Sequence, residues 1–162
     1  QAISYVVLME DAINRAFEAE LVKPRLQNLE APALTQLSGG DPVSFRDVSV
    51  TLQPNQRVTV KATTDLPNRA DVPLQLSATL AVKKRRRLVF DDASVDLEGI
   101  PADVQPLSRL LTEALLDVLN AMVDLDRFNL DGITLRLNRL ETQGKKLIFS
   151  GYAQIDHFPK AG

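Results

Sequence analysis

The sequence lacks cysteine and tryptophan entirely and contains a single histidine. The absence of cysteine excludes a disulfide framework, a thiol nucleophile and a cysteine-based zinc site, and it leaves the redox compartment open. The one histidine, His157, lies near the carboxyl terminus, where we expect a solvated or capping side chain. Ser38, Gly39 and Gly40 do not match the nucleophile elbow of a serine hydrolase. We therefore expect no enzymatic activity and no cofactor.

An excess of charge of one sign is also missing. The 19 Lys and Arg residues oppose 21 Asp and Glu residues, which gives a net charge of −2. A dedicated nucleic-acid binder gains its affinity by neutralising phosphates, and this balance is too even for that class. Acidic residues do cluster at Asp124, Asp126 and Asp131, but no Glu closes them into a calcium-binding loop. We expect neither nucleic-acid binding nor a metal site.

Long apolar runs are absent as well. No run approaches the ~20 residues that a helix needs to cross a bilayer. The first residues do not show the basic, apolar and small-residue pattern of a signal peptide. We therefore expect no membrane span. Because the chain begins at Gln1 and not at methionine, we expect a processed chain or part of a longer one.

The remaining composition is that of a globular chain of 162 residues, with 44% hydrophobic and 25% charged residues. This length fits a single domain over residues 1–162. Apolar residues at spacings of three and four predict a helix over residues 9–22, ended by Pro24, and a more apolar helix over residues 101–122. The second helix is apolar on more than one side, so we expect it to lie between two layers or to line a cavity.

Alternating apolar and polar residues predict strands at 48–52, 58–62, 72–82 and 89–97. A turn at residues 54–56 separates the first two, and residues 63–71 predict a longer loop. On the fourth strand the pattern places Val89, Ala93, Val95 and Leu97 on the buried face. A final hairpin pairs residues 133–137 with 147–155 across a turn at 143–144. Short connections imply antiparallel pairing, so the fold class is α+β with an antiparallel meander.

Several short sequence motifs are informative beyond the periodicity of their apolar residues. They read MEDAINRAF at residues 9–17, VDLDRF at 123–128, LDGITL at 130–135 and IDHFP at 155–159. In these motifs the sequence resembles the LmeA-like phospholipid-binding family of bacterial proteins. The resemblance implies a fold similar to tubular lipid-binding proteins, with a curved antiparallel sheet of about six strands wrapped around one or two long helices. It further implies an apolar groove, no catalytic residues, and a periplasmic or peripheral membrane location.

Two hypotheses follow. The first is binding of phospholipid or another long apolar ligand in a groove between the helices and the curved sheet. The second is a non-catalytic protein-interaction module of a membrane-associated or envelope protein. A cavity of ~300–1,000 Å³ would favour the first, and a solid core would favour the second. The predicted ligand-binding residues are Ile13, Phe17, Leu111, Leu115, Leu119, Met122, Leu135 and Phe149.

Five adjacent cations form a basic run between the third and fourth predicted strands: Lys83, Lys84, Arg85, Arg86 and Arg87. The purely structural interpretation is a solvated hairpin tip. The functional interpretation is weak, reversible association with an anionic membrane surface, because each cation near such a surface contributes roughly 1 kcal/mol. Nucleic acid is ranked lower because only Phe90 stands nearby as a stacking platform. The sequence leaves the oligomeric state open.

Overall fold

The computed structural model describes residues 3–20, 22–29, 42–66, 69–85, 87–122 and 133–155. The elements in chain order are β1 (Ile3–Met9), α1 (Glu10–Phe17), the 3-10 helix η1 (Lys23–Leu26), β2 (Ser44–Leu52), β3 (Arg57–Leu66), β4 (Arg69–Lys83), β5 (Arg87–Asp96), α3 (Gln105–Met122), β6 (Ile133–Gln143) and β7 (Lys146–Ile155). His157 and the acidic cluster at residues 124–131 lie outside the described residues.

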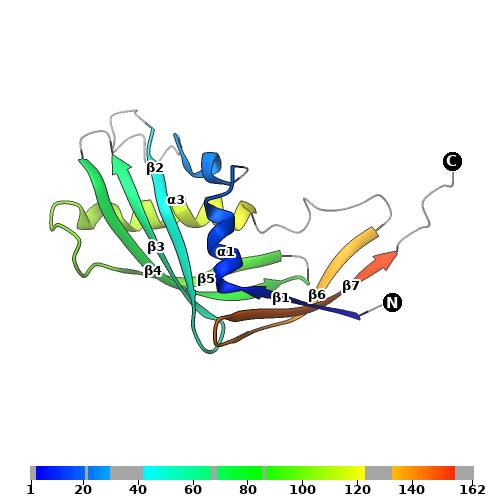
Figure 1. Ribbon diagram of the computed structural model, residues 1–162. Coiled ribbons are helices and arrows are strands. Elements are labelled where there is room, and N and C mark those ends of the chain that lie inside the picture. The colour runs from blue at the N-terminus through cyan, green and yellow to red at the C-terminus, as the bar shows by residue number, and fades with distance from the viewer. Residues whose placement is uncertain are drawn as a thin grey trace, which may run out of the picture.

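Strands β2 to β5 form an antiparallel sheet in which each strand pairs with the next along the chain (Figure 1). This arrangement confirms the predicted meander and the predicted turn at residues 54–56. The predicted loop over residues 63–71 is wrong, because β3 continues to Leu66 and β4 begins at Arg69. Cross-strand pairs such as Thr64 with Val72 and Leu66 with Arg69 extend the sheet up to both sides of residues 67–68.

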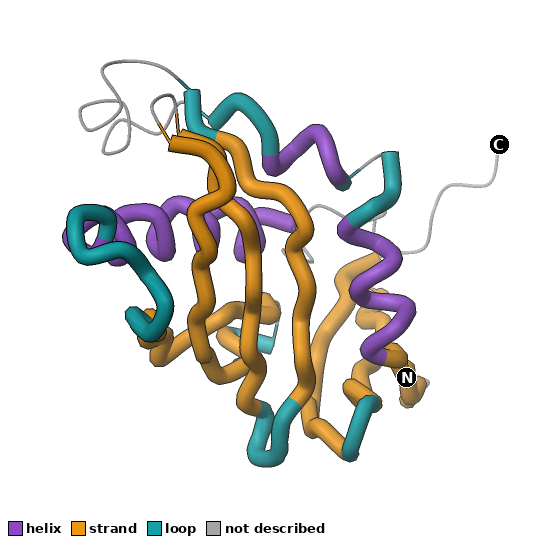
Figure 2. The backbone as a smooth tube through the Cα atoms, turned by 60° about the vertical axis from the view of Figure 1, so that its left-hand side comes forward, coloured by secondary structure: helices purple, strands orange, loops and turns teal. Residues whose placement is uncertain are grey.

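Helix α3 lies across one face of the four-stranded sheet (Figure 2). Its inward residues Leu111, Leu115 and Leu119 are 0–2% exposed and pack on the inner face of β2 to β4. The structure begins this helix at Gln105, with Pro106 in the first turn, where the missing amide has no intrahelical partner to lose. The predicted helix over residues 101–122 is thus correct apart from its first turn.

A second antiparallel sheet has the order β1-β7-β6. The hairpin of β6 and β7 was predicted, but β1 was not. Strand β1 is a run of apolar residues on both faces, and the alternation that reveals a half-buried strand is therefore absent from it. The expectation of one sheet of about six strands is corrected to two sheets, with three and four strands among the described residues.

Helix α1 is shorter than the predicted helix over residues 9–22. The amides of Glu18 and Ala19 donate to carbonyls three residues back, which tightens the last turn and ends the α-helix. Pro24 then lies in the 3-10 helix η1, near its start.

Turns at one end of the four-stranded sheet join it to β6. The amide of Leu137 donates to the Arg85 carbonyl at 2.7 Å. In the turn between β2 and β3, the Gln56 side chain donates to the Leu140 carbonyl and the Gln56 amide donates to the Thr142 hydroxyl at 3.1 Å. These bonds satisfy backbone groups along the outer edge of β6, so the two sheets form a continuous wall.

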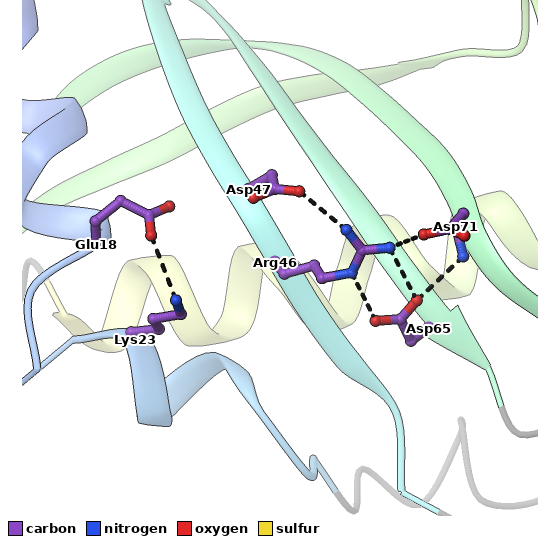
Figure 3. A network of polar contacts seen from close by, with 6 residues as sticks. All are labelled: Glu18, Lys23, Arg46, Asp47, Asp65 and Asp71. Atoms are coloured by element: carbon purple, nitrogen blue, oxygen red, sulfur yellow. Dashed lines mark hydrogen bonds and ion pairs between the residues drawn. The ribbon is translucent and has the colours of Figure 1, made fainter.

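Near the other end of the sheet, Arg46 gathers three carboxylates (Figure 3). Its Nε lies 2.8 Å from Asp65 Oδ2 and its Nη1 lies 3.0 Å from Asp47 Oδ2, while Nη2 contacts Asp71. The Asp71 amide donates to Asp65 Oδ1 at 3.0 Å. Because Arg46 and Asp65 are about one-third exposed and Asp47 and Asp71 are more exposed still, the network links β2, β3 and β4 without a large contribution to stability.

Candidate functional site

An apolar pocket of about 300 Å³ lies where α1, the end of α3 and both sheets meet. Every described lining residue is apolar, so the part of the wall that the structure describes offers no side-chain hydrogen-bond donor or acceptor. The lining residues are Leu8, Ala12, Ile13, Ala16, Phe17, Val22, Val50, Leu52, Leu80, Leu88, Phe90, Leu119 and Leu147. Such a wall suits a hydrocarbon and offers nothing to a polar substrate.

Helix α1 supplies one wall of the pocket through residues four apart. Ile13 and Phe17 form one pair at this spacing, and Ala12 and Ala16 form another, so all four share one side of the helix. The two alanines reach only to Cβ, and the helix therefore leaves space between its axis and the sheet.

Polar side chains of α1 fix the helix along the edge of β2. Asn14 pairs with both backbone groups of Val50, because its Nδ2 donates to the carbonyl at 3.0 Å and its Oδ1 accepts from the amide at 2.6 Å. Glu10 Oε2 accepts from the Leu52 amide at 3.0 Å. These bonds satisfy the edge strand much as a neighbouring strand would. Val50 and Leu52 both line the pocket, so the edge strand that α1 covers is part of the pocket wall.

The sheet wall comes from the hairpin of β4 and β5. Leu80 lies opposite Phe90, and Leu88 precedes Phe90 by two residues on the same face of β5. Helix α3 is tied to this wall because Asn120 Oδ1 accepts from the Phe90 amide at 2.9 Å. That bond holds Leu119, the residue before Asn120, at the inner end of the pocket.

The inward face of β5 differs from the prediction. Asp92 adopts a positive φ of 50°, and the pairing of β4 with β5 shifts between Ser77 and Thr79. Such a bulge moves side chains from one face to the other. Before the bulge, Leu88 and Phe90 face the pocket, so the prediction of Val89 and Ala93 as buried is wrong. After it, Val95 packs on the core, whereas Leu97 is 40% exposed, against the prediction.

The predicted ligand-binding residues fall into three groups. Ile13, Phe17 and Leu119 line the pocket. Leu111 and Leu115 lie deeper along α3, in the core between the helix and the sheet, and Phe149 packs half-buried against that core. Met122 ends α3 and Leu135 lies in β6, but their side chains are outside the described part of the chain.

Sequence reasoning missed the strand residues of the pocket. Leu80 belonged to a predicted strand but was not assigned to the site. Leu88 and Phe90 were hidden by the bulge, and Leu8 belongs to the strand that was not predicted. Leu147 shares a strand face with Phe149, two residues away, so strand periodicity was the available signal for it.

The basic run forms the connection from β4 to β5, with Lys83 paired to Arg87 across the hairpin. Lys84 and Arg85 are exposed, and both have positive φ values of 54° and 56°. Arg86 lies outside the described residues. Leu88, which lines the pocket, directly follows Arg87 in the chain, so the basic run is adjacent to the pocket wall.

Lys83 is partly committed to a carboxylate. Its Nζ lies 3.1 Å from Asp91 Oδ2, and both side chains are about half exposed. The hydrogen bond from Lys83, the bond from the Asp92 amide and the charge of Lys83 together hold the pKa of Asp91 below its ordinary value. The Asp91 carboxylate therefore competes with an outside phosphate for Lys83.

Two further observations limit the chemistry of the described chain. No cluster of three or more metal-ligating side chains occurs among the residues that the structure describes. Within the same residues, none of the helices has the length and hydropathy needed to cross a membrane.

Comparison with known proteins gives one strong match. The model of the LmeA-like phospholipid-binding family matches residues 1–151. Among solved structures, a crystal structure of lipopolysaccharide binding protein is similar at 12% sequence identity with a TM-score of 0.29. That match covers 95% of this chain and 41% of that chain, so this chain spans less than half the length of that protein. No curated protein matches the sequence.

Proposed function

The chain belongs to the LmeA-like phospholipid-binding family, and we propose that it binds phospholipid by enclosing an acyl chain in the apolar pocket. The observation that carries this proposal is the wholly apolar lining of a cavity of about 300 Å³. The volume is at the lower end of the range for ligand pockets, ~300–1,000 Å³. A cavity at this position favours lipid binding over the alternative of an interaction module with a solid core.

The volume sets how much of a lipid the pocket encloses. Water occupies roughly 30 Å³ in the liquid, and a methylene group is of similar size, so the pocket holds about ten methylenes. Burying ~10 methylenes at ~0.8 kcal/mol each gives about 8 kcal/mol before the cost of ordering the ligand. This gross value corresponds to a micromolar Kd and is an upper limit for one chain, because association and ordering of the ligand subtract from it. The glycerol, the phosphate and any second chain then remain outside the pocket.

Filling the pocket from α1 tests this proposal. Ala12 is only partly buried and lines the pocket, so Ala12→Phe places a ring in the cavity without removing a core side chain. Ala93→Phe is the matched control on the exposed surface of β5. We expect Ala12→Phe to weaken binding of a fluorescent fatty-acyl probe in vesicle-free solution by at least about tenfold, and Ala93→Phe to bind as wild type does. A folded Ala12→Phe variant with unchanged affinity would exclude this pocket.

We further propose that the basic run contributes weak, reversible association with anionic membranes. Lys84 and Arg85 are exposed at the hairpin tip, and each contributes roughly 1 kcal/mol near an anionic surface. These contributions fall off beyond a Debye length of ~10 Å at 0.1 M salt. A carrier that must leave the membrane again requires weak attraction of this kind.

Charge reversal tests this part separately. The double variant Lys84→Glu and Arg85→Glu should co-sediment less with anionic vesicles at low salt and equally at high salt. Lys61→Glu with Arg25→Glu is the matched control, since both residues are exposed cations on β3 and η1. Equal loss in the two double variants would mean that net charge, not the basic run, governs association.

A further inference from the structure

One face of the three-stranded sheet exposes apolar side chains that no part of the described chain covers. Successive residues of a strand point to opposite faces, and Leu8 of β1 lines the pocket. Tyr5, Val7 and Met9 therefore point away from the pocket. They are 75%, 51% and 44% exposed, which is more than Val6 and Leu8 on the opposite face, at 40% and 38%. Isolated exposed apolar residues need no explanation, but three neighbouring ones on the same face of an edge strand do.

The strand register extends this surface across the sheet. Val7 pairs with Ile148 of β7, and Ile3 pairs with Tyr152 of the same strand. Both tyrosines of the chain consequently lie on this face. We define the outer face by its apolar members Tyr5, Val7, Met9, Ile148 and Tyr152.

Cations border the outer face on its β7 and β6 side. Met9 pairs with Lys146, and Ser150, which pairs with Tyr5, pairs on its other side with Arg139. Lys145 precedes Lys146 at the turn, and all three cations are exposed. Against them stands Glu141, which pairs with Ile148 and whose Oε1 accepts from the Gln143 side chain at 3.2 Å. A chain of net charge −2 thus carries a local positive excess beside exposed apolar residues.

We propose that the outer face docks on an anionic phospholipid bilayer, in addition to the basic run. Tyrosine is favoured at the membrane interface, because its ring is apolar and its hydroxyl reaches the headgroups. Val7 and Met9 enter the upper acyl region, while Arg139, Lys145 and Lys146 lie at the depth of the phosphates. The apolar centre and its cationic border are complementary to the two layers of such a surface.

A second copy of the chain fits the outer face less well. In a two-fold contact each side of the patch meets the opposite side of the other copy, so the cations on the β7 and β6 side would face β1, which has no acidic residue. A membrane with anionic headgroups turns the same cations into favourable contacts. The charge pattern therefore favours lipid over self-association.

Docking through the outer face also orients the pocket. Val7 and Leu8 are neighbours on β1, one facing outward and the other lining the pocket. The pocket is then separated from the bilayer by a single layer of sheet, on the order of 10 Å. This consequence rests on the proposed function, whereas the docking itself does not require the pocket to hold lipid.

The absence of tryptophan makes docking directly measurable. Tyr5→Trp places the only indole of the chain on the outer face, and Thr51→Trp is a control on the exposed side of β2. The vesicles contain phosphatidylglycerol and phosphatidylcholine in equal parts, with bromine on the phosphatidylcholine chains. We expect the emission of Tyr5→Trp to shift to the blue and to be quenched by the bromines, and the emission of Thr51→Trp to stay unchanged.

A second variant separates the outer face from the basic run. Val7→Asp should reduce co-sedimentation with the same vesicles by about tenfold, because an apolar side chain that enters the bilayer is replaced by a charge. Thr51→Asp should have little effect. Absence of quenching in the Tyr5→Trp variant would overturn the proposal, as would a dimer in sedimentation analysis that Val7→Asp dissociates. The acyl-probe assay for the pocket contains no vesicles. A negative result for membrane docking therefore does not affect the test of the pocket.

Discussion

Gly151 controls how closely β6 and β7 approach in the middle of the three-stranded sheet. It pairs with Leu137, beside the bulge that β6 makes between Leu137 and Arg139. A Cβ atom at this position would meet the carbonyl oxygen of Arg136 at a distance that real side chains do not adopt. The backbone would have to move, since the obstructing atom belongs to the main chain.

We expect Gly151→Ala to lower the free energy of unfolding by about 1–3 kcal/mol, the usual cost of overpacking a close contact. Ala153→Val is the control on the same strand, because Ala153 is exposed and its change should stay within ~0.5 kcal/mol. Urea denaturation of the three proteins measures both effects. Equal stability of Gly151→Ala and wild type would show that β6 yields at the bulge without cost.

The ion pair of Lys83 with Asp91 makes a prediction about pH. The pKa of Asp91 is depressed in the folded chain, so the carboxylate stabilises the fold above its ordinary pKa, and this contribution is lost as pH falls through the lower value. Lys83→Met should raise the pKa of Asp91 towards the ordinary range, and Lys84→Met should leave it unchanged. An NMR titration of the Asp91 carboxyl carbon measures this pKa in both variants. Identical titration of Asp91 in wild type and Lys83→Met would mean that the Asp92 amide alone depresses the pKa.

Among the elements, α1 depends most on a few polar contacts. The helix has eight residues and none of them is fully buried, so its own propensity does not hold it in place. Asn14 and Glu10 attach it to the edge of β2, and its position in turn defines one wall of the pocket.

We expect Asn14→Leu to destabilise the chain by about 1–3 kcal/mol, because the amide and carbonyl of Val50 lose their partners. Asn14→Asp keeps the acceptor for the Val50 amide and should fall between Asn14→Leu and wild type. Hydrogen exchange at Val50 reports the contact directly, and Arg15→Ala on the exposed side of α1 is the control. If Val50 exchanges at the same rate in Asn14→Leu, the helix is held by its apolar contacts alone.

Periodicity predicted most of the elements, and the exceptions have identifiable causes. The strands β2 to β4 and the helix α3 bury one face, so apolar residues recur with the period of the element. Strand β1 has apolar residues on both faces, and nothing in its pattern distinguishes it from a buried segment of a helix. The face of β5 was wrong because the bulge at Asp92 inverts the alternation, and one residue with a positive φ is not visible in an apolar pattern.

The pocket was predicted only from its helices. Ile13, Phe17 and Leu119 followed from helical spacing, since a helix shows its apolar side in sequence. The strand residues that complete the wall come together through strand pairing and through the hydrogen bonds that join α1 to β2 and α3 to β5. Those contacts involve Asn14 and Asn120, which local sequence rules treat as ordinary polar surface residues.

At the scale of the whole molecule, the two sheets, α1 and α3 together form a wall around one apolar space. The turns between β2 and β3 and between β4 and β5 close this wall on the β6 side, and α1 closes it on the β2 side. The outer face belongs to the three-stranded sheet. The basic run contacts the same sheet through the hydrogen bond from the Leu137 amide to the Arg85 carbonyl. The pocket lies on the inner side of this wall, and the outer face lies on the opposite side of the three-stranded sheet.

The most direct measurement is methyl NMR with a phospholipid that carries a spin label near the end of one acyl chain. We expect the label to broaden the methyl signals of Leu80, Leu88 and Leu147 in the pocket. The signals of Val72 and Ile100, which form a separate buried cluster, should stay sharp, and reduction of the label should restore the broadened ones. Absence of broadening, or broadening that is as strong at Val72 and Ile100, would contradict binding of an acyl chain in the pocket.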